Sequence, residues 1–189
     1  SEYGFDEYGA FNCSGPQMYV HDDVKSAIPF IEKSHKADKP FFINLWIHEP
    51  HTPFHVDPKL QKRFAKLGEK DAIYAATLFH ADLRIGQLLD ALDRLKITNN
   101  TLVIFSSDNG PARGAPDAPL TLGYDSATGL GYGIAAAKGI TGGRKGYKAA
   151  LFEGGIGVPF IARWPGKIAA GKVDKTSIFS AVDLLPTFC

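Results

Sequence analysis

The sequence predicts an α/β domain with a largely parallel sheet flanked by helices. Residues 41–47 and 101–105 form near-continuous apolar runs, which favour strands covered on both faces. Between these runs, residues 71–95 carry apolar side chains at helical spacing. Strands that alternate with helices along a chain are typical of a parallel sheet.

The chain has the size and composition of an ordinary globular protein. Its 189 residues suit one domain or a large part of one, and 44% of them are hydrophobic. With 21 basic and 20 acidic residues, the formal net charge is +1, so electrostatics gives no reason to expect a nucleic acid or an anionic membrane as a partner. No apolar run is long enough for a membrane span. We therefore expect no nucleic-acid partner and no membrane span.

A loop and one helix are expected before the first strand. Residues 1–20 have no clear period and predict a loop. Asp22 or Asp23 can cap a helix that extends to about Ser34. Because Pro29 lies inside this pattern, the helix is expected to be kinked or to start later. After the first strand, closely spaced prolines prevent further pairing.

The strongest predicted helix and a long irregular segment follow. The apolar stripe of the helix at residues 71–95 consists of Leu78, Ile85, Leu88, Leu92 and Leu95. Residues 111–147 have no period, and so long an irregular segment is usually functional or mobile. A third strand is expected at residues 157–164. Residues 181–189 begin like an amphipathic helix without a polar terminator, so we expect the chain to be a partial domain.

Polar groups follow the ends of the first two predicted strands. His51 lies in a proline-bounded loop after the first, and Asp108 and Asn109 follow the second. Ligands in open α/β sheets bind at the carboxyl ends of strands, so we expect these groups to face one crevice. Carboxylate and amide oxygens suit a hard cation such as calcium, and an imidazole can protonate a leaving oxygen. A strand-to-loop turn and a structural loop histidine are the plainer alternatives.

A glycine-rich segment carries Lys145 and Lys148, whose ammonium groups suit an anion. A solvated basic loop is the alternative interpretation. His48 and His55 are weaker candidates than His51. Three histidines within eight residues could suggest zinc, but their spacing is not that of a zinc site and no cysteine accompanies them.

The remaining histidines, His21, His35 and His80, occupy positions that the sequence treats as ordinary surface or helix positions. We assign them no function.

In order and spacing, these segments resemble the sulfatase family over nearly the whole chain, except residues 111–143. The resemblance rests on Phe41-Phe42, Pro50-His51-Thr52-Pro53, the run from Asn100 to Gly110, Lys148 with Glu153-Gly154-Gly155, Arg163-Trp164-Pro165-Gly166 and Asp183-Leu184-Leu185-Pro186-Thr187. It implies an alkaline-phosphatase-like α/β fold, a calcium ion and a formylglycine nucleophile. Residues 1–189 are then the C-terminal part of one sulfatase catalytic domain.

The resemblance also implies individual roles. Asp108 and Asn109 match the second pair of metal ligands of the family. His51 matches the histidine at the sulfate or leaving oxygen, and Lys148, five residues before Glu153, matches the sulfate-binding lysine.

Other positions are less directly supported or depart from the family pattern. Lys145 is the alternative sulfate-binding residue if the loop shifts register, and Arg113 lies in the loop where we expect substrate selection. Cys13 lacks the Pro/Ala-x-Arg context of the formylglycine motif, so the nucleophile is expected outside this chain. Gly157 stands where the family often has arginine.

The function implied is hydrolysis of sulfate monoesters on a sulfated small molecule or a sulfated carbohydrate. The segment alone is expected to be inactive and to bind calcium weakly or not at all. A phosphodiesterase, phosphonate hydrolase or phosphomutase of the same superfamily is one alternative, and a non-catalytic module that keeps the fold is another. The resemblance alone suggests a periplasmic, extracellular or lysosomal location.

Overall fold

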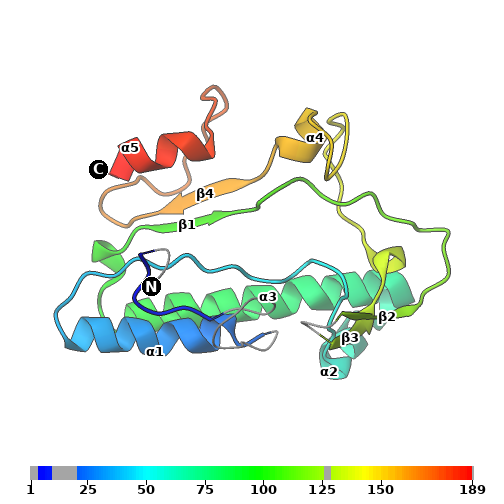
Figure 1. Cartoon of the computed structure of the whole chain (residues 1–189), viewed down its shortest axis with the longest axis horizontal. Helices are drawn as coiled ribbons and strands as arrows, with labels where there is room; N and C mark the ends of the chain where they lie inside the picture. The colour runs from blue at the N-terminus through cyan, green and yellow to red at the C-terminus, as the bar shows by residue number, and fades with distance from the viewer. Residues whose placement is uncertain (1–3, 10–20, 126–128, 189) are drawn as a thin grey trace.

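Two long helices and a pair of strands form the layers of the molecule (Figure 1). Helices α1 (Asp23–Lys36) and α3 (Glu69–Arg94) pack against each other. Strands β1 (Val103–Ser106) and β4 (Phe160–Arg163) lie above them in the view of Figure 1. This computed structural model describes residues 4–9, 21–125 and 129–188.

Shorter elements lie in the connections between these layers. They are α2 (Pro58–Arg63), η1 (Ala65–Leu67), η2 (Thr98–Asn100), β2 (Leu122–Asp125), β3 (Gly129–Tyr132), η3 (Ile134–Ala136), α4 (Glu153–Ile156), η4 (Ala181–Asp183) and α5 (Leu184–Phe188). Among the described residues, no helix combines the length and the apolar character needed to cross a membrane.

Helix α1 begins where the sequence predicts and continues through Pro29. Asp22 is the residue before the helix, but its side chain makes no capping hydrogen bond. Instead, Asp23 Oδ1 accepts a hydrogen bond from the Val24 backbone N–H at 2.6 Å. The expectation that the helix starts later is therefore wrong. Pro29 has no backbone N–H to donate, but the first turn of α1 does not require one from this residue. The buried face consists of Asp23, Val24, Ala27 and Ile31.

Helix α3 buries a different face from the predicted leucine stripe. Leu78 is 42% exposed, and Leu92 is the member of the stripe that is fully buried. The buried residues are Ala72, Ile73, Ala76, Thr77, Ala81, Arg84, Ala91 and Leu92. Most are small, and small side chains let a helix approach its neighbours closely. The predicted stripe is thus wrong at Leu78, because close approach decided which face is buried.

Residues 41–47 are extended but do not form the expected strand. Alternate side chains face solvent, and Phe42 and Trp46 are 71% and 78% exposed. A strand needs a neighbour that takes up its backbone hydrogen bonds, and no strand in the described part of the chain pairs with this segment. The prediction of a strand buried on both faces is therefore wrong here.

The largely parallel sheet is not observed among the described residues. β1 pairs with β4 in antiparallel register, with Val103 opposite Arg163, and β2 pairs with β3 in the same sense. The physical reason lies at the end of β1, where the Gly110 N–H donates to the Gly155 carbonyl at 2.7 Å. The chain therefore enters β4 from the end at which it left β1, and the two strands must run in opposite directions.

The described part of residues 111–147 contains more regular structure than the sequence predicts. It contains the β2–β3 hairpin, which is joined to the loop after residue 50 by backbone hydrogen bonds between Phe54 and Tyr132 of 2.8 and 3.0 Å. Phe54 is 1% exposed and belongs to a core cluster with Ile73 and Ala136. This core fixes the loop that carries His51 against α3.

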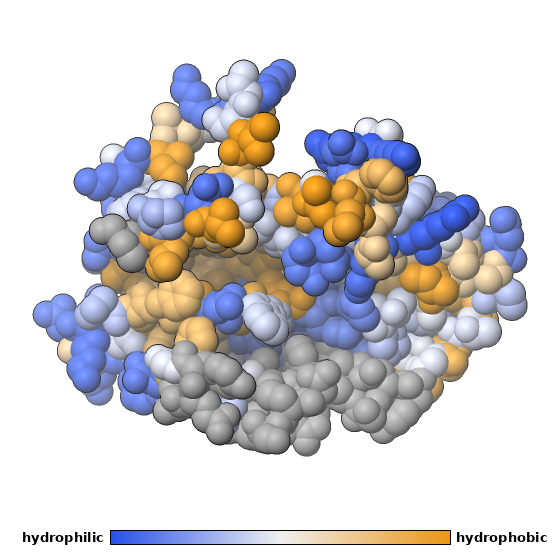
Figure 2. Space-filling view, turned by 45° about the horizontal axis from the view of Figure 1, so that its top comes forward, coloured by the Kyte–Doolittle hydropathy of each residue, from blue (hydrophilic) through white to orange (hydrophobic). Residues whose placement is uncertain are grey.

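A large apolar surface remains exposed. Figure 2 shows apolar side chains gathered around a hollow on one face of the molecule. The most exposed large apolar residues of the described chain include Trp46, Ile140, Leu151 and Ile178, with exposed fractions between 78% and 100%. Exposed apolar surface of this extent is typical of interaction sites.

Candidate functional site

The fold brings His51 and Lys148 into direct contact. Lys148 Nζ lies 3.0 Å from His51 Nε2, although the two residues are 97 positions apart. His51 Nδ1 lies 2.6 Å from the Thr52 carbonyl oxygen, which can only accept a hydrogen bond. Nδ1 therefore carries a proton, and Nε2 is free to accept one from the lysine. Both side chains are exposed, so an anion can reach them.

Backbone contacts hold Lys148 beside the Asp108–Asn109 loop. The Lys148 N–H donates to the Pro111 carbonyl at 2.9 Å. Close by, Gly110 is buried against Gly154, and a Cβ added to Gly110 would lie 1.9 Å from the Gly154 carbonyl oxygen. This close approach of the two backbones requires glycine at position 110. It also holds the segment that carries Lys148 next to the end of β1.

Asp108 and Asn109 present oxygen atoms at the exposed end of this loop. The Asn109 side-chain Nδ2 donates to the Gly110 carbonyl at 2.9 Å, which fixes the amide and turns its own carbonyl oxygen away from that bond. Asp108 Oδ1 accepts from the Asn109 N–H at 2.9 Å, and Asp108 is exposed. Adjacent carboxylate and amide oxygens are donors that calcium accepts, and they provide part of the roughly six to eight oxygens it takes.

The other two predicted substrate residues, Lys145 and Arg113, make different contacts. Lys145 Nζ stands 4.0 Å from the centre of the Phe152 ring, in a cation–π contact. Arg113 is exposed and lines a hollow together with Tyr147, the neighbour of Lys148. The structure thus places Lys148, rather than Lys145, against the histidine, and it leaves Arg113 beside the same segment.

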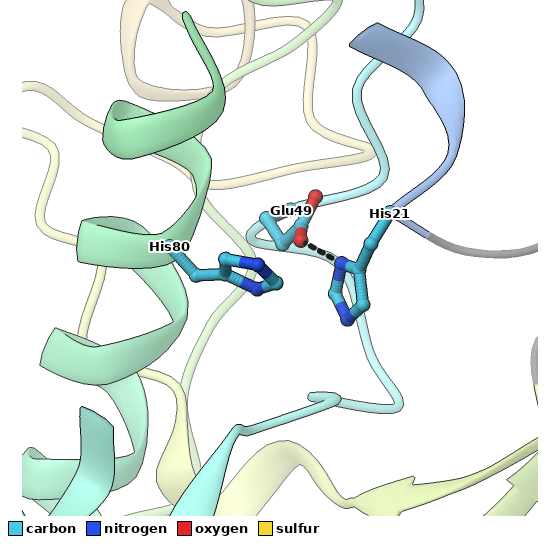
Figure 3. Close-up of side chains that lie close together, drawn as sticks. All are labelled: His21, Glu49 and His80. Atoms are coloured by element: carbon cyan, nitrogen blue, oxygen red, sulfur yellow. Dashed lines mark ion pairs between the residues drawn. The ribbon is translucent and has the colours of Figure 1, made fainter. Parts of the chain in front are cut away.

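A second polar cluster lies behind this loop and was not expected from the sequence. Figure 3 shows Glu49, from the loop, between the rings of His21, just before α1, and His80, on α3. Glu49 Oε1 lies 2.5 Å from His21 Nδ1, and the ring centres of His21 and His80 are 4.4 Å apart. Ligand atoms of the three side chains all lie within 4.8 Å of one another.

A buried arginine balances the charges of this cluster. Arg84 Nη2 donates to Glu49 Oε2 at 2.6 Å and to Asp23 Oδ2 at 3.3 Å, and all three residues are nearly inaccessible to solvent. Burial alone would raise the pKa of Glu49, but contact with His21 and the charge of Arg84 outweigh it and hold this pKa below its usual value. Burial dominates at Asp23 and raises its pKa.

The two clusters are linked by histidine rings. Successive ring centres are 5.7 Å apart for His51 and His48, 5.6 Å for His48 and His55, and 6.1 Å for His55 and His21. Burial lowers the pKa of His48 and of His80, so the neutral imidazole is favoured at both. Five of the six histidines of the chain, all except His35, thus form one connected group.

Sequence spacing does not predict the second cluster, because its members lie roughly thirty residues apart on three different segments. One signal was present. His80 and Arg84 are separated by one helical turn on the face of α3 that packs inward, and a charged residue there requires a partner.

Comparison with known proteins gives a consistent result over the whole chain. The sequence profile of the Sulfatase family matches residues 2–189. The chain is 35% identical to human arylsulfatase H over 166 residues, which is 87% of this chain and 25% of that protein. It is 30% identical to N-acetylgalactosamine-6-O-sulfatase of Bacteroides thetaiotaomicron over 151 residues, covering 80% of this chain and 26% of that protein.

A solved structure has a similar fold. The crystal structure of Ps i-CgsB in complex with k-i-k-neocarrahexaose superposes with a TM-score of 0.71 at 28% identity, covering 94% of this chain and 34% of that chain. The chain spans about a quarter to a third of the length of the relatives it matches.

Proposed function

This chain belongs to the sulfatase family, and from that premise we propose that the complete gene product hydrolyses sulfate monoesters with His51 and Lys148 in its active site. The 3.0 Å contact between His51 Nε2 and Lys148 Nζ carries this proposal. An ammonium and an imidazole that meet at the surface beside oxygen donors form an arrangement suited to a small tetrahedral anion.

Lys148 serves as the electrostatic clamp for the sulfate. Its ammonium is exposed, and it can turn from His51 Nε2 to a sulfuryl oxygen without breaking a buried contact. Negative charge grows on these oxygens and on the bridging oxygen during hydrolysis, so a fixed positive charge stabilises the transition state more than the ground state.

His51 assists the departure of the alcohol. Its Nδ1–H donates to the Thr52 carbonyl oxygen, and this hydrogen bond orients the ring. When Nε2 is also protonated, it can donate to the bridging oxygen of the leaving group. This role requires the imidazolium form, and the negative charge of a bound sulfate favours that form.

Asp108 and Asn109 provide oxygen ligands for a metal ion, and we propose calcium because carboxylate and amide oxygens are hard donors. When bound, the ion would supply positive charge at the sulfuryl oxygens. The two residues offer only part of a calcium shell, so further ligands and the formylglycine are proposed to come from outside these 189 residues. Cys13, which lacks the nucleophile context, lies outside the described residues.

A sulfated carbohydrate is the proposed substrate class. One relative is an N-acetylgalactosamine-6-O-sulfatase, and the similar solved structure is a complex with a neocarrahexaose. Arg113 and Lys145 are exposed near the proposed site and can contact further anionic groups of such a substrate.

The test is turnover of 4-nitrophenyl sulfate by the complete gene product. Lys148→Ala is expected to lower kcat/KM by about a hundred- to a thousandfold, the usual loss for one electrostatic donor. Lys172→Ala is the matched control, because Lys172 is an exposed lysine in the connection between β4 and η4. Equal turnover by the two variants would exclude Lys148 from the site, and a wild-type preference for 4-nitrophenyl phosphate would overturn the proposed reaction.

A further inference from the structure

We propose that His21, Glu49 and His80 form a binding site for a first-row transition-metal ion, with zinc as the expected occupant. Their ligand atoms lie within 4.8 Å of one another. In tetrahedral zinc sites with bonds of about 2.0–2.1 Å, neighbouring ligand atoms are roughly 3.3 Å apart. Small rotations of side chains already in place are therefore enough to close the site. The proposal does not depend on sulfate chemistry.

One of the donor atoms, His80 Nδ1, lacks a hydrogen-bond partner among the described residues, and a second, Glu49 Oε1, is paired at 2.5 Å with His21 Nδ1 without hydrogen-bond alignment. Both atoms are buried. Buried polar atoms are nearly always satisfied, because an unsatisfied one costs about 1–3 kcal/mol. Both atoms belong to the same small group, and a cation between them would be a partner for both.

The surroundings orient the carboxylate for this purpose. Arg84 Nη2 donates to Glu49 Oε2 at 2.6 Å, and Asp23 holds the same guanidinium from the other side at 3.3 Å. The second oxygen, Oε1, is thereby directed at the two rings (Figure 3). Ligating carboxylates in metal sites are commonly fixed by such an outer hydrogen bond.

The positive charge of Arg84 is the feature that opposes a cation, because Arg84 Nη1 also lies 3.0 Å from His21 Nδ1. The carboxylates of Glu49 and Asp23 offset the guanidinium, and imidazoles bind a metal ion in their neutral form, so they would add no charge. The ion would therefore bind to Oε1, on the side of the carboxylate away from Arg84.

The donor types select the kind of metal. Calcium and magnesium prefer oxygen ligands, whereas imidazole nitrogen with one carboxylate suits zinc and its first-row neighbours. The site is thus chemically distinct from the oxygen pair of Asp108 and Asn109. Three protein ligands leave a fourth position of a tetrahedral ion open to water.

The position of the site indicates what the metal does. Glu49 lies two residues before His51, while His21 precedes α1 and His80 belongs to α3. A bound ion would join these three segments and fix the loop that presents His51. We therefore assign the metal a bracing role, with His21, Glu49 and His80 as positioning residues for His51.

The test is zinc titration by calorimetry on the complete gene product, stripped of transition metals and saturated with calcium. The expected result is one calcium-insensitive zinc site, weakened by Glu49→Gln and by His80→Ala by more than the roughly 10- to 100-fold that loss of an outer-shell partner costs. His35→Ala is the matched control, because His35 is exposed on α1 outside the cluster, and it is expected to bind zinc like the wild type.

Cobalt(II) provides a second readout that does not need activity. Intense visible absorption of four-coordinate cobalt is expected in the wild type and in His35→Ala, and it should be lost in His80→Ala. Circular dichroism establishes that each variant is folded. Absence of zinc binding by the wild type would overturn the proposal without reference to any variant, and so would unchanged affinity in folded Glu49→Gln and His80→Ala. Loss of sulfatase turnover in Lys148→Ala with zinc binding intact would separate this site from the proposed function.

Discussion

Gly110 is the position at which one methyl group should disturb the whole site. A Cβ at this residue would lie 1.9 Å from the Gly154 carbonyl oxygen and 2.9 Å from its carbonyl carbon. These are backbone atoms that no rotamer change can move away. The two backbones must therefore separate by more than an ångström, and the hydrogen bond from the Gly110 N–H to the Gly155 carbonyl is lost.

The expected cost of Gly110→Ala follows from these two effects. Overpacking of a buried contact costs about 1–3 kcal/mol, and a buried hydrogen bond left unmade adds about 1–3 kcal/mol. Together these give a destabilisation of about 2–6 kcal/mol, which is a large share of the ordinary stability of about 5–15 kcal/mol. Because Asp108 and Asn109 lie on the same loop, calcium affinity and sulfate turnover should fall as well.

Urea unfolding of the complete gene product, monitored by circular dichroism, measures this cost. Gly86→Ala is the matched control, because Gly86 lies in α3 and nothing stands within 4 Å of its added Cβ. The control should gain about 0.5–1 kcal/mol from the better helix propensity of alanine. An unfolding midpoint for Gly110→Ala equal to that of the wild type would refute the close packing of the two backbones.

Three further predictions concern burial, charge and metal. Arg84→Met removes the buried guanidinium shared by Asp23 and Glu49 and should cost about 3–5 kcal/mol in unfolding free energy. Arg94→Met, at an exposed ion pair, should cost at most about 1 kcal/mol, and equal effects of the two variants would contradict the buried pairing. Burial raises the pKa of Tyr74, so the contribution of its neutral side chain to the free energy of unfolding is fully present below pH 10 and is lost as the pH rises further. Tyr74→Phe should therefore lose less stability than the wild type between pH 8 and pH 11, and identical losses would exclude a buried phenol. Asp108→Ala should weaken calcium binding in calorimetry more than Asn109→Ala, because it removes a charge; unchanged affinity in both would remove the loop from the calcium site.

Some features were readable from the sequence because they depend on local chemistry. Helices α1 and α3 were predicted mainly from helical periodicity, and their predicted bounds lie within two residues of the observed ones. The pairing of His51 with Lys148 was implied by the family resemblance, and the two side chains do meet at 3.0 Å. Their roles in catalysis stay predictions.

Other features could not be predicted in this way. The segment 41–47 has the composition of a buried strand, but a strand exists only where a neighbour accepts its hydrogen bonds. The prediction that Leu78 belongs to the buried face of α3 was wrong, because periodicity identifies an apolar face without showing which face has room for a close neighbour.

Taken alone, the sequence determined the family, the two long helices and the residue types available at the end of β1, because these depend on patterns within short stretches of chain. The tertiary structure decided the antiparallel direction of β4, through the backbone contact of Gly110 with Gly155. It also decided the meeting of His21, Glu49 and His80. Contacts between segments so far apart in the sequence depend on how the whole chain packs, and the periodicity of a short stretch of sequence does not predict them.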